Sequence, residues 1–394
     1  MVIDSGNIRG VNLGGWLLME GYILRGRNIP ESLFKENFKK VFGEKELRDF
    51  ERLFRGNFII REDFKNISQM GANAIRVPFH YKLIESKPYR YSQEGFNYLD
   101  KIFSWAGRHS LGVILDLHAA CGSQNYDWHS DSCGKALLWK NKEYSKRTVA
   151  LWESVSDRYK DNDSLIGYDF LNEPVLEDSD LPKLKSLYGI LIKRIREIDR
   201  NHTFFLEGSL WAQRIDFLKD LLAENIAVSI HNYLPLEYTF NFSPFLNFPG
   251  KINKVLWCKD RILKHLEPYY LFSRKNNVKI FVGEFGINWR GGFWGELRWL
   301  EAVLEAYKEY GFGYTYWTYK AVANNVFPDG IYQYIPNSKY VNRQGPLYGW
   351  ETYSGFWKKN KKDLGEFWKT NGYCPNPGII SMLKKHFILE PQAA

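Results

Sequence analysis

The sequence predicts an α/β fold, a (β/α)8 or TIM barrel, and three observations lead to that prediction. Eight short runs of apolar and β-branched residues recur along the 394 residues of the chain. Stretches with helical periodicity lie between most of these runs, and polar side chains stand at the carboxyl ends of nearly all of them. Near-continuous apolar strands that alternate with amphipathic helices are typical of parallel strands whose outer face is covered. Eight such units favour a closed barrel over an open sheet.

The eight predicted strands share a high content of Val, Ile, Leu and aromatic residues. In chain order they are "IRGVNLGGW" (8–16), "ANAIRVPFH" (72–80), "GVILDLH" (112–118), "LIGYDFLNEP" (165–174), "TFFLEGS" (203–209), "IAVSIHNY" (226–233), "KIFVGEFG" (279–286) and "GFGYTYWTY" (311–319). An open doubly wound sheet would require a glycine-rich phosphate turn after an early strand. The nearest candidate, within residues 8–16, lacks both the spacing and an immediately following helix.

Helices are predicted where apolar residues recur at three- and four-residue spacing between the strands. The clearest segments are "FNYLDKIFSWAGRH" (96–109), "LKSLYGILIKRIREI" (184–198) and "GELRWLEAVLEAYKEY" (295–310). We find no other internal repeat and no low-complexity linker, so we expect one catalytic domain over residues 1–394. A C-terminal extension around 361–394 is expected to pack on the barrel.

Long connections leave the predicted carboxyl ends of four strands, and barrel active sites are built from such loops. These βα loops cover about residues 17–60, 119–143, 234–270 and 320–360. Aromatic residues make up 17% of the chain, and aromatic faces in a cleft suit the apolar faces of sugar rings. The candidate sugar-binding rings are Trp128, Trp139 and Trp350. For any single ring, packing within the loop is the alternative interpretation.

The charge distribution argues against a nucleic-acid partner. The net charge is +9, but Lys and Arg are interleaved with acids, and clusters such as "FWKKNKKDLG" (356–365) are typical of solvated faces. No apolar run precedes "MVIDSGNIRG", and no stretch approaches the roughly 20 apolar residues of a membrane span. We therefore expect no membrane partner and a cytoplasmic location, with secretion as the alternative if an export signal has been removed.

Cysteine and histidine spacing does not predict a metal or cofactor site. Four cysteines are too few for a disulfide framework, although a single Cys121–Cys133 bridge stays open. Cys121, His129 and Cys133 are close in sequence, but a fourth zinc ligand is missing. Asp116 and His118 likewise lack a third ligand at convincing spacing, so we predict no metal and no cofactor.

Polar residues at the ends of the predicted strands form the candidate site. In a barrel these positions converge on one bowl, although they span most of the chain. They are Arg76 and His80, Asp116 and His118, Asn172 and Glu173, Glu207, His231 and Tyr233, Glu284, and Trp317.

Two of these residues, Glu173 and Glu284, predict glycoside hydrolysis. They lie on the fourth and seventh strands, and carboxyl groups about 5–5.5 Å apart are what a retaining glycosidase requires. We expect Glu173, beside neutral Asn172, to keep its proton and act as acid and then base. Glu284, within reach of Arg76 and Tyr233, would stay ionised and act as nucleophile. Asn172 would donate to a sugar 2-hydroxyl, and Glu207 is expected to support the site rather than react.

The ordered set of motifs resembles glycoside hydrolase family 5, the cellulase-like (β/α)8 retaining enzymes. The motifs span about residues 8–320 and read "RGVNLGGWL", "AIRVPF", "LDLHAACGSQN", "LNEP", "HNY", "GEFG" and "YWTYK". The resemblance implies that Glu173 is the acid/base and Glu284 the nucleophile. It also implies substrate-binding or supporting roles for Arg76, His118, Asn172, His231, Tyr233 and Trp317.

The resemblance implies a β-linked oligosaccharide or polysaccharide as substrate. "GVNLGGWL" and "LDLHAACGSQN" are similar to the exo-β-1,3-glucanase branch, whose long loops close the cleft into a pocket, so we expect exo action on gluco-oligosaccharides or β-glucan. "YDWHSDSCGKALLW" and "ANNVFPDGIYQY" depart from that branch. A β-mannosidase or β-mannanase, a transglycosylase on the same site, and a non-catalytic carbohydrate-binding barrel stay open as alternatives.

Overall fold

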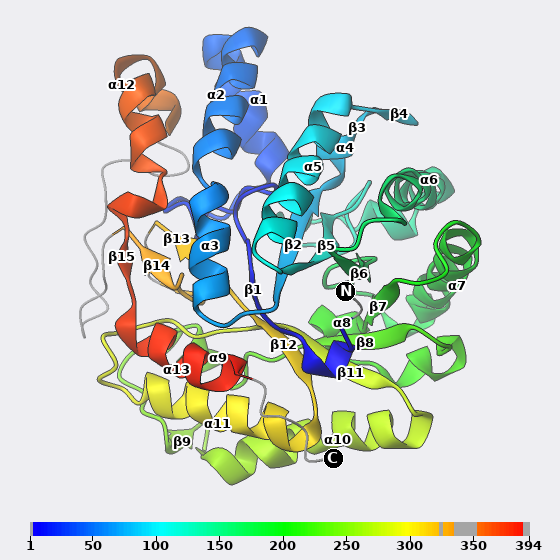
Figure 1. Ribbon diagram of the computed structural model, residues 1–394, viewed down its shortest axis with the longest axis vertical. Helices are drawn as coiled ribbons and strands as arrows, with labels where there is room; N and C mark the ends of the chain where they lie inside the picture. Colours follow the sequence, from blue (N-terminus) through cyan, green and yellow to red (C-terminus); the bar gives the residue numbers. More distant parts are fainter. Residues whose placement is uncertain (1–2, 323–325, 335–352, 389–394) are drawn as a thin grey trace.

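The computed structural model describes residues 3–322, 326–334 and 353–388, and it confirms the predicted barrel (Figure 1). Eight parallel strands close in the order β1-β12-β11-β8-β7-β6-β5-β2. Their bounds are Arg9–Asn12 (β1), Ala74–His80 (β2), Gly112–Ala119 (β5), Leu165–Asp169 (β6), Thr203–Glu207 (β7), Ile226–His231 (β8), Lys279–Phe285 (β11) and Gly313–Tyr316 (β12). Seven of the eight predicted runs contain one of these strands, and the eighth, 112–118, is one residue shorter than β5.

The barrel interior is apolar at one end and polar at the other. Side chains two residues apart point to the same face of a strand, so every second residue of each barrel strand points into the barrel. Phe205 precedes Glu207 on β7, and Ala74 precedes Arg76 on β2. The apolar members form a separate small core of Ile8, Ala74, Ile114, Ile166, Phe205, Ala227 and Phe281. The polar members are left at the carboxyl ends of the strands.

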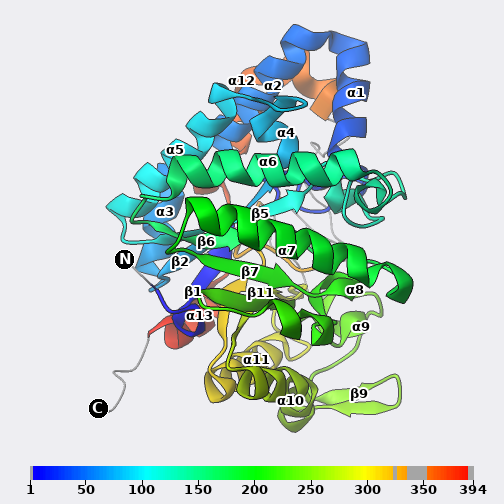
Figure 2. The ribbon, with the colours of Figure 1, turned by 90° about the vertical axis from the view of Figure 1, so that its right-hand side faces the viewer.

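Helices cover the outside of the barrel, and the three predicted helices are confirmed. They are α5 (Gln93–Arg108), α7 (Leu181–Ile198) and α11 (Glu296–Tyr310), and α6 (Lys142–Tyr159) runs beside α7 (Figure 2). The Ser92 side chain accepts a hydrogen bond from the Gly95 N–H and so caps α5, as serine commonly does at a helix start. The remaining outer helices are α3 (Arg61–Gln69) and α10 (Lys259–Asn276). No helix among the described residues is long and apolar enough to cross a membrane.

The connection over residues 17–60 contains two helices that were not predicted, α1 (Glu31–Phe42) and α2 (Glu44–Asn57). Phe38 on α1 and Phe50 on α2 pack with their ring centroids 4.8 Å apart. Trp357, on α12 (Tyr353–Phe367), packs edge-on against both rings. This connection is therefore an ordered helical hairpin that the C-terminal part of the chain covers.

The last helix, α13 (Pro377–Phe387), lies against the barrel. The Tyr314 hydroxyl on β12 donates to the His386 carbonyl over 2.9 Å, and the Phe387 ring stacks on Tyr314. The buried Lys320 ammonium donates to the Trp368 carbonyl and to Thr370 Oγ1, both over 2.8 Å.

Cys121 and Cys133 are both free, so the disulfide bridge left open above does not form.

Candidate active site

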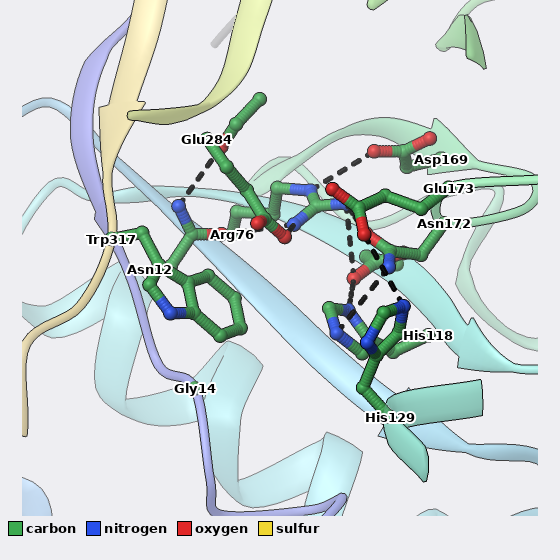
Figure 3. A network of polar contacts seen from close by, with 12 residues as sticks. Asn12, Gly14, Arg76, His118, His129, Asp169, Asn172, Glu173, Glu284 and Trp317 are labelled. Carbon is green, nitrogen blue, oxygen red and sulfur yellow. Dashed lines mark hydrogen bonds and ion pairs between the residues drawn. The ribbon is translucent and has the colours of Figure 1, made fainter. Parts of the chain in front are cut away.

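Arg76 lies at the centre of the polar end of the barrel (Figure 3). Its fully buried guanidinium forms ion pairs with four carboxylates from four different strands. These are Asp116 at 3.1 Å, Asp169 at 2.9 Å, Glu207 at 3.0 Å and Glu284 at 2.8 Å. The same guanidinium also donates to Asn12 Oδ1 over 3.1 Å and to Asn172 Oδ1 over 2.9 Å. One cation thus fixes residues from β1, β5, β6, β7 and β11.

Four carboxylates around one guanidinium cannot all be ionised at low cost, because like charges raise one another's pKa. Burial raises the pKa of Asp169 well above its usual range, and the charge of Glu207 adds to the effect. These surroundings favour the protonated form of Asp169. The pKa of Arg76 is raised by its carboxylate partners despite burial, which keeps the guanidinium charged.

Both oxygens of Glu284 are held by hydrogen-bond donors. Arg76 Nη1 donates to Oε1 over 2.8 Å, and the Tyr233 hydroxyl donates to Oε2 over 2.8 Å. Burial and the charge of Glu284 raise the pKa of Tyr233 well above its usual range, so the phenol keeps its proton. Glu284 is therefore held in position by Arg76 and Tyr233, the two residues predicted to lie within its reach.

Glu173 is held between two imidazoles. His231 Nδ1 lies 2.6 Å from Oε1, and His129 Nε2 lies 3.2 Å from Oε2. The backbone N–H of Glu173 donates to Glu207 Oε2 over 2.5 Å and holds the residue at a φ of +49°, in the left-handed region that costs a non-glycine residue energy. This turn directs the carboxyl group into the site.

The prediction that Glu173 keeps its proton is wrong, because the surroundings of Glu173 favour its ionised form. Burial favours the neutral acid, but hydrogen bonds from His129 and His231 outweigh burial and hold the pKa of Glu173 below its usual range. Burial would lower the pKa of His129, whereas its hydrogen bond with Glu173 raises it to about 9. Burial likewise opposes the charge on His231, but Glu207 and Glu284 raise its pKa well above the usual range. The protons thus reside on the histidines.

The two candidate carboxylates lie close enough for double displacement. Ligand atoms of Glu173, His231 and Glu284 all lie within 4.8 Å of one another. A gap of this size fits the roughly 5–5.5 Å of retaining enzymes and leaves no room for the water that an inverting enzyme places across about 6.5–9.5 Å.

Within the described part of the chain, the same three residues are the one group whose spacing suits a metal ion. A metal needs neutral imidazole, however, and the carboxylates around His231 favour its charged form. Cys121, His129 and Cys133 do not form such a group, because His129 faces Glu173. We therefore assign no metal to these side chains.

The remaining predicted residues complete one wall of the site. The His118 ring stacks on Trp317 with centroids 5.4 Å apart and 11° between the planes. Asp116 Oδ2 lies 2.7 Å from His118 Nδ1, which orients the ring. The Tyr22 hydroxyl accepts a hydrogen bond from Trp317 Nε1. His118 and Trp317 therefore present fixed ring edges and faces to a ligand.

A pocket of about 350 Å³ is lined by His118, Trp317 and Tyr22 together with Glu173, His231, Tyr233 and Glu284. Trp128 lines the pocket as predicted. Trp139 does not, because its indole N–H donates to the Gln124 carbonyl over 2.8 Å and its ring faces a separate groove between α6 and α7. Trp350 lies outside the described residues.

Several lining residues were not predicted, namely Glu20, Tyr22, Asp127, His129, Trp211, Phe240 and Phe327. Glu20 and Tyr22 belong to "GGWLLMEGYIL", where a buried acid within an apolar run was the available signal. His129 was considered only as a metal ligand. Trp211 lies shortly after the fifth predicted strand, and this position at the carboxyl end of a strand was the available signal for a pocket residue.

Comparisons with known proteins agree with this geometry. A family model described as Cellulase (glycosyl hydrolase family 5) matches residues 36–322. A protein named beta-xylosidase, from Phanerodontia chrysosporium, is 29% identical over 80% of this chain and 67% of its own length. A probable glucan 1,3-beta-glucosidase A from Aspergillus fumigatus is 27% identical over 83% of this chain and 88% of its own length. A solved structure titled as a glycoside hydrolase matches 96% of this chain and 99% of its own with a TM-score of 0.66 at 19% identity, which supports the fold.

We predict that Arg76 stabilises the fold as well as the site. Replacing Arg76 with Met leaves buried carboxylates without their counter-charge, so the free energy of unfolding should fall by about 3–5 kcal/mol. Urea denaturation measures the change. The control is Arg52→Met, which removes a surface pair with Glu94 at 2.8 Å and should change stability little. Equal effects of the two variants would contradict the central role of Arg76.

The raised pKa of His129 predicts a loss of stability at alkaline pH. Unfolded His titrates near pH 6.5, whereas folded His129 titrates at about 9. Its stabilising contribution is therefore complete below about pH 6.5 and is lost as the pH rises through 9. At about 1.4 kcal/mol for each pKa unit, the loss amounts to at most about 3.5 kcal/mol.

Thermal unfolding between pH 6 and 9.5 tests this effect. His129→Gln should flatten the decline seen in the wild type. His265→Gln is the matched control, because burial lowers the pKa of His265, so this residue contributes no loss of stability as the pH rises. Part of the decline should survive, because the pKa of His231 is raised as well. A decline of the same size in His129→Gln as in the wild type would refute the assignment.

Proposed function

The chain belongs to the cellulase family, glycosyl hydrolase family 5, and is a glycoside hydrolase. We propose that it hydrolyses β-linked gluco-oligosaccharides or β-glucan from the chain ends and that the anomeric configuration is retained. One observation carries the proposal: Glu173 and Glu284 present carboxylate oxygens within 4.8 Å of each other to a pocket of about 350 Å³. This volume is at the small end of the roughly 300–1,000 Å³ range of ligand sites, which favours one or a few sugar units over a long chain.

In the first step a Glu284 oxygen attacks the anomeric carbon, and the bond from that carbon to the leaving-group oxygen breaks. Arg76 and Tyr233 orient the attacking carboxylate through its two oxygens. Glu173 transfers a proton to the departing oxygen. We propose that its histidine partners supply that proton, and the 2.6 Å contact with His231 Nδ1 provides the route to Glu173.

In the second step Glu173 acts as the base. It removes a proton from water as the water oxygen attacks the anomeric carbon and the bond to Glu284 breaks. The contacts from His129 and His231 favour the ionised form of Glu173 that this step requires. The low pKa of Glu173 therefore suits deglycosylation, whereas the first step depends on proton transfer within the cluster.

Glu20 supports recognition of a terminal sugar. Its side chain is buried, it lines the pocket, and its Oε1 has no hydrogen-bond partner among the described residues. Burial raises the pKa of Glu20 to about 7. A buried polar atom without a partner is costly, and a sugar hydroxyl would satisfy it. Because Glu20 and Tyr22 belong to the connection after β1, that connection closes the sugar-binding end of the pocket.

Aromatic rings surround the mouth of the pocket. Phe327 lies 5.2 Å from Phe240 and 5.6 Å from Trp128, measured between ring centroids. Such a group of rings suits the apolar faces of pyranose units. The relative from Aspergillus fumigatus is named a probable glucan 1,3-beta-glucosidase, and this name supports a β-linked glucose substrate.

An activity screen tests the proposal. The substrates are aryl β-glucoside, β-xyloside and β-mannoside, together with laminari-, cello- and manno-oligosaccharides. NMR of the first-formed product should show a β-anomer, and chromatography should show single glucose units released from chain ends. Net inversion would refute the nucleophile assignment, and release of internal fragments would refute exo action.

Alanine variants should separate the roles of the two glutamates. Glu173→Ala should lower kcat by about 10²–10⁴-fold on poor leaving groups and much less on a 2,4-dinitrophenyl glycoside, which needs no acid. Glu284→Ala should abolish turnover of both substrates. Added azide should give a β-glycosyl azide with Glu173→Ala and an α-glycosyl azide with Glu284→Ala. The opposite pattern of azide products would exchange the two roles.

Removal of the Glu20 carboxylate should weaken glycone recognition. The loss of one charge-assisted hydrogen bond, worth about 1.5–3 kcal/mol, predicts a fall in kcat/KM of about 10- to 100-fold for Glu20→Ala on an aryl β-glucoside. Glu237→Ala is the control, because Glu237 lies on α9 (Leu236–Thr239) near the pocket without lining it among the described residues. A normal kcat/KM in Glu20→Ala would contradict this assignment.

A further inference from the structure

The loops after β8 and β11 carry exposed apolar side chains with basic residues around them, and we propose that this surface docks on an anionic phospholipid bilayer. We call it the hairpin surface. It consists of residues 242–256, which include most of the hairpin of β9 (Gly250–Ile252) and β10 (Val255–Trp257), and of residues 293–298. The inference goes beyond the proposed function and does not depend on it, because it concerns binding and not turnover.

Exposed apolar side chains are concentrated on the hairpin surface. The described residues include fourteen large apolar side chains that are exposed, and five of these lie within 242–256 and 293–298. The five are Phe242, Phe245, Val255, Leu256 and Phe293, with exposed fractions between 37% and 65%. A single exposed apolar side chain needs no explanation, whereas a group of them marks an interaction surface.

Contacts between the loops make the hairpin surface continuous. The Ser243 N–H donates to the Glu237 carbonyl over 3.1 Å, and Asn253 Nδ2 donates to the Glu237 carboxylate. The loop after β8 therefore lies beside the turn of the hairpin. The Phe245 ring packs against Trp294 with centroids 5.6 Å apart, which joins the loop after β11 to the same surface.

The hairpin presents an apolar residue where the strand pattern favours a polar one. β9 and β10 pair antiparallel, with Leu256 opposite Lys251. Side chains alternate between the two faces of a strand. Because Ile252 is buried, the neighbouring Lys251 and the Leu256 opposite it point away from the protein. The outward face of an antiparallel pair is normally polar, so packing within the fold does not account for Leu256.

Backbone conformation fixes how these side chains are presented. Asn253 and Lys254 have φ angles of 48° and 65°, as in the type I′ turns that are preferred in two-residue hairpins. Phe245 has a φ of 67°, which is unfavourable for a bulky residue and persists only where the surrounding structure enforces it. The hairpin turn and the exposed Phe245 ring are therefore held in defined positions.

The charges among the apolar residues are basic. Lys251, Lys254 and Arg298 are exposed, and none of them forms an ion pair with another described residue. Residues 242–256 contain no acid, and Glu296 is buried. Apolar side chains flanked by Lys and Arg are the combination that binds the interface of anionic membranes. Peripheral contact needs no spanning segment, the feature on which the sequence-based expectation of no membrane partner depended.

Two other occupants fit the hairpin surface less well. Neutral β-glucan could stack on the aromatic rings but would not use the aliphatic Val255 and Leu256 or the basic side chains. A second copy of the chain would bring the same patch of each copy together, so the basic residues would repel one another. An anionic bilayer uses both the apolar and the basic side chains.

The hairpin surface reaches the mouth of the pocket. The Phe242 ring lies 5.4 Å from Phe240 and 5.5 Å from Phe327, measured between centroids, and both of these rings line the pocket. The hairpin of β9 projects from the body of the protein in Figure 2. Docking through this surface would therefore place the mouth of the pocket close to the lipid headgroups.

Co-sedimentation of the whole chain with vesicles tests the inference. The probes are vesicles of equimolar phosphatidylcholine and phosphatidylserine, and vesicles of phosphatidylcholine alone. Each basic residue at an anionic surface contributes about fivefold to affinity, so the wild type should bind the anionic vesicles at least about tenfold more tightly. Lys251→Glu with Lys254→Glu should remove this preference. Phe245→Ala with Leu256→Ala should weaken binding to the anionic vesicles by about tenfold.

The matched control is Ile190→Ala with Lys193→Glu, since these two exposed residues lie on α7 and outside the hairpin surface. The control should bind the anionic vesicles as the wild type does. Circular dichroism checks that all variants are folded, which is expected because every substituted side chain is exposed.

Several outcomes would overturn the inference. They are a wild type that binds neither kind of vesicle, equal binding to both kinds, and an equal loss of binding in the control. A dimer in sedimentation velocity that Phe245→Ala with Leu256→Ala dissociates, without vesicle binding, would assign the surface to a second copy. Binding to insoluble β-glucan that this variant loses, again without vesicle binding, would assign it to polysaccharide. None of these measurements uses turnover, so the proposed function is tested separately.

Discussion

The buried guanidinium of Arg76 is the interaction on which the rest of the site depends. It is fully buried and pairs with carboxylates from four strands. A charge in this position is tolerable only when several anions and amide oxygens surround it, and a closed parallel barrel brings those groups together from distant parts of the chain. The same bonds that offset the desolvation of Arg76 also fix Glu284, so fold stability and the position of the nucleophile have a common origin.

The barrel and the two glutamates could be predicted from the sequence because both depend on short-range patterns. An apolar run that ends in a polar residue predicts a barrel strand, and the polar residue also indicates which end of that strand faces the active site. Trp139 shows where this reasoning fails, since its presence in a loop did not reveal that its N–H binds the Gln124 carbonyl. His129 and Trp211 were missed for a related reason. Their roles come from contacts with Glu173 and Asp127, which lie far away in sequence.

The protonation of Glu173 illustrates the same limit in electrostatic terms. Its sequence neighbour Asn172 is neutral, and a carboxyl group beside a neutral amide in a buried site would be expected to keep its proton. The pKa is instead set by two imidazoles, one from the loop after β5 and one from the end of β8. The raised pKa values of these histidines favour their charged forms, and in the mechanism that we propose the carboxyl group between them donates one proton and later accepts one. The cluster therefore functions as a unit, and assigning its proton to a single residue describes only one stage of the reaction.

The loops that line the pocket differ in how closely they are coupled to the candidate carboxylates. The connection after β1 supplies Glu20 and Tyr22 to the pocket lining, and the loops after β5 and β7 supply Asp127 and Trp211. The loop after β5 is bonded to Glu173 itself, because Asn125 Nδ2 donates to the Glu173 carbonyl over 2.8 Å and His129 Nε2 lies 3.2 Å from Glu173 Oε2. A substitution in this loop is therefore expected to change the position and protonation of Glu173 together with the shape of the pocket.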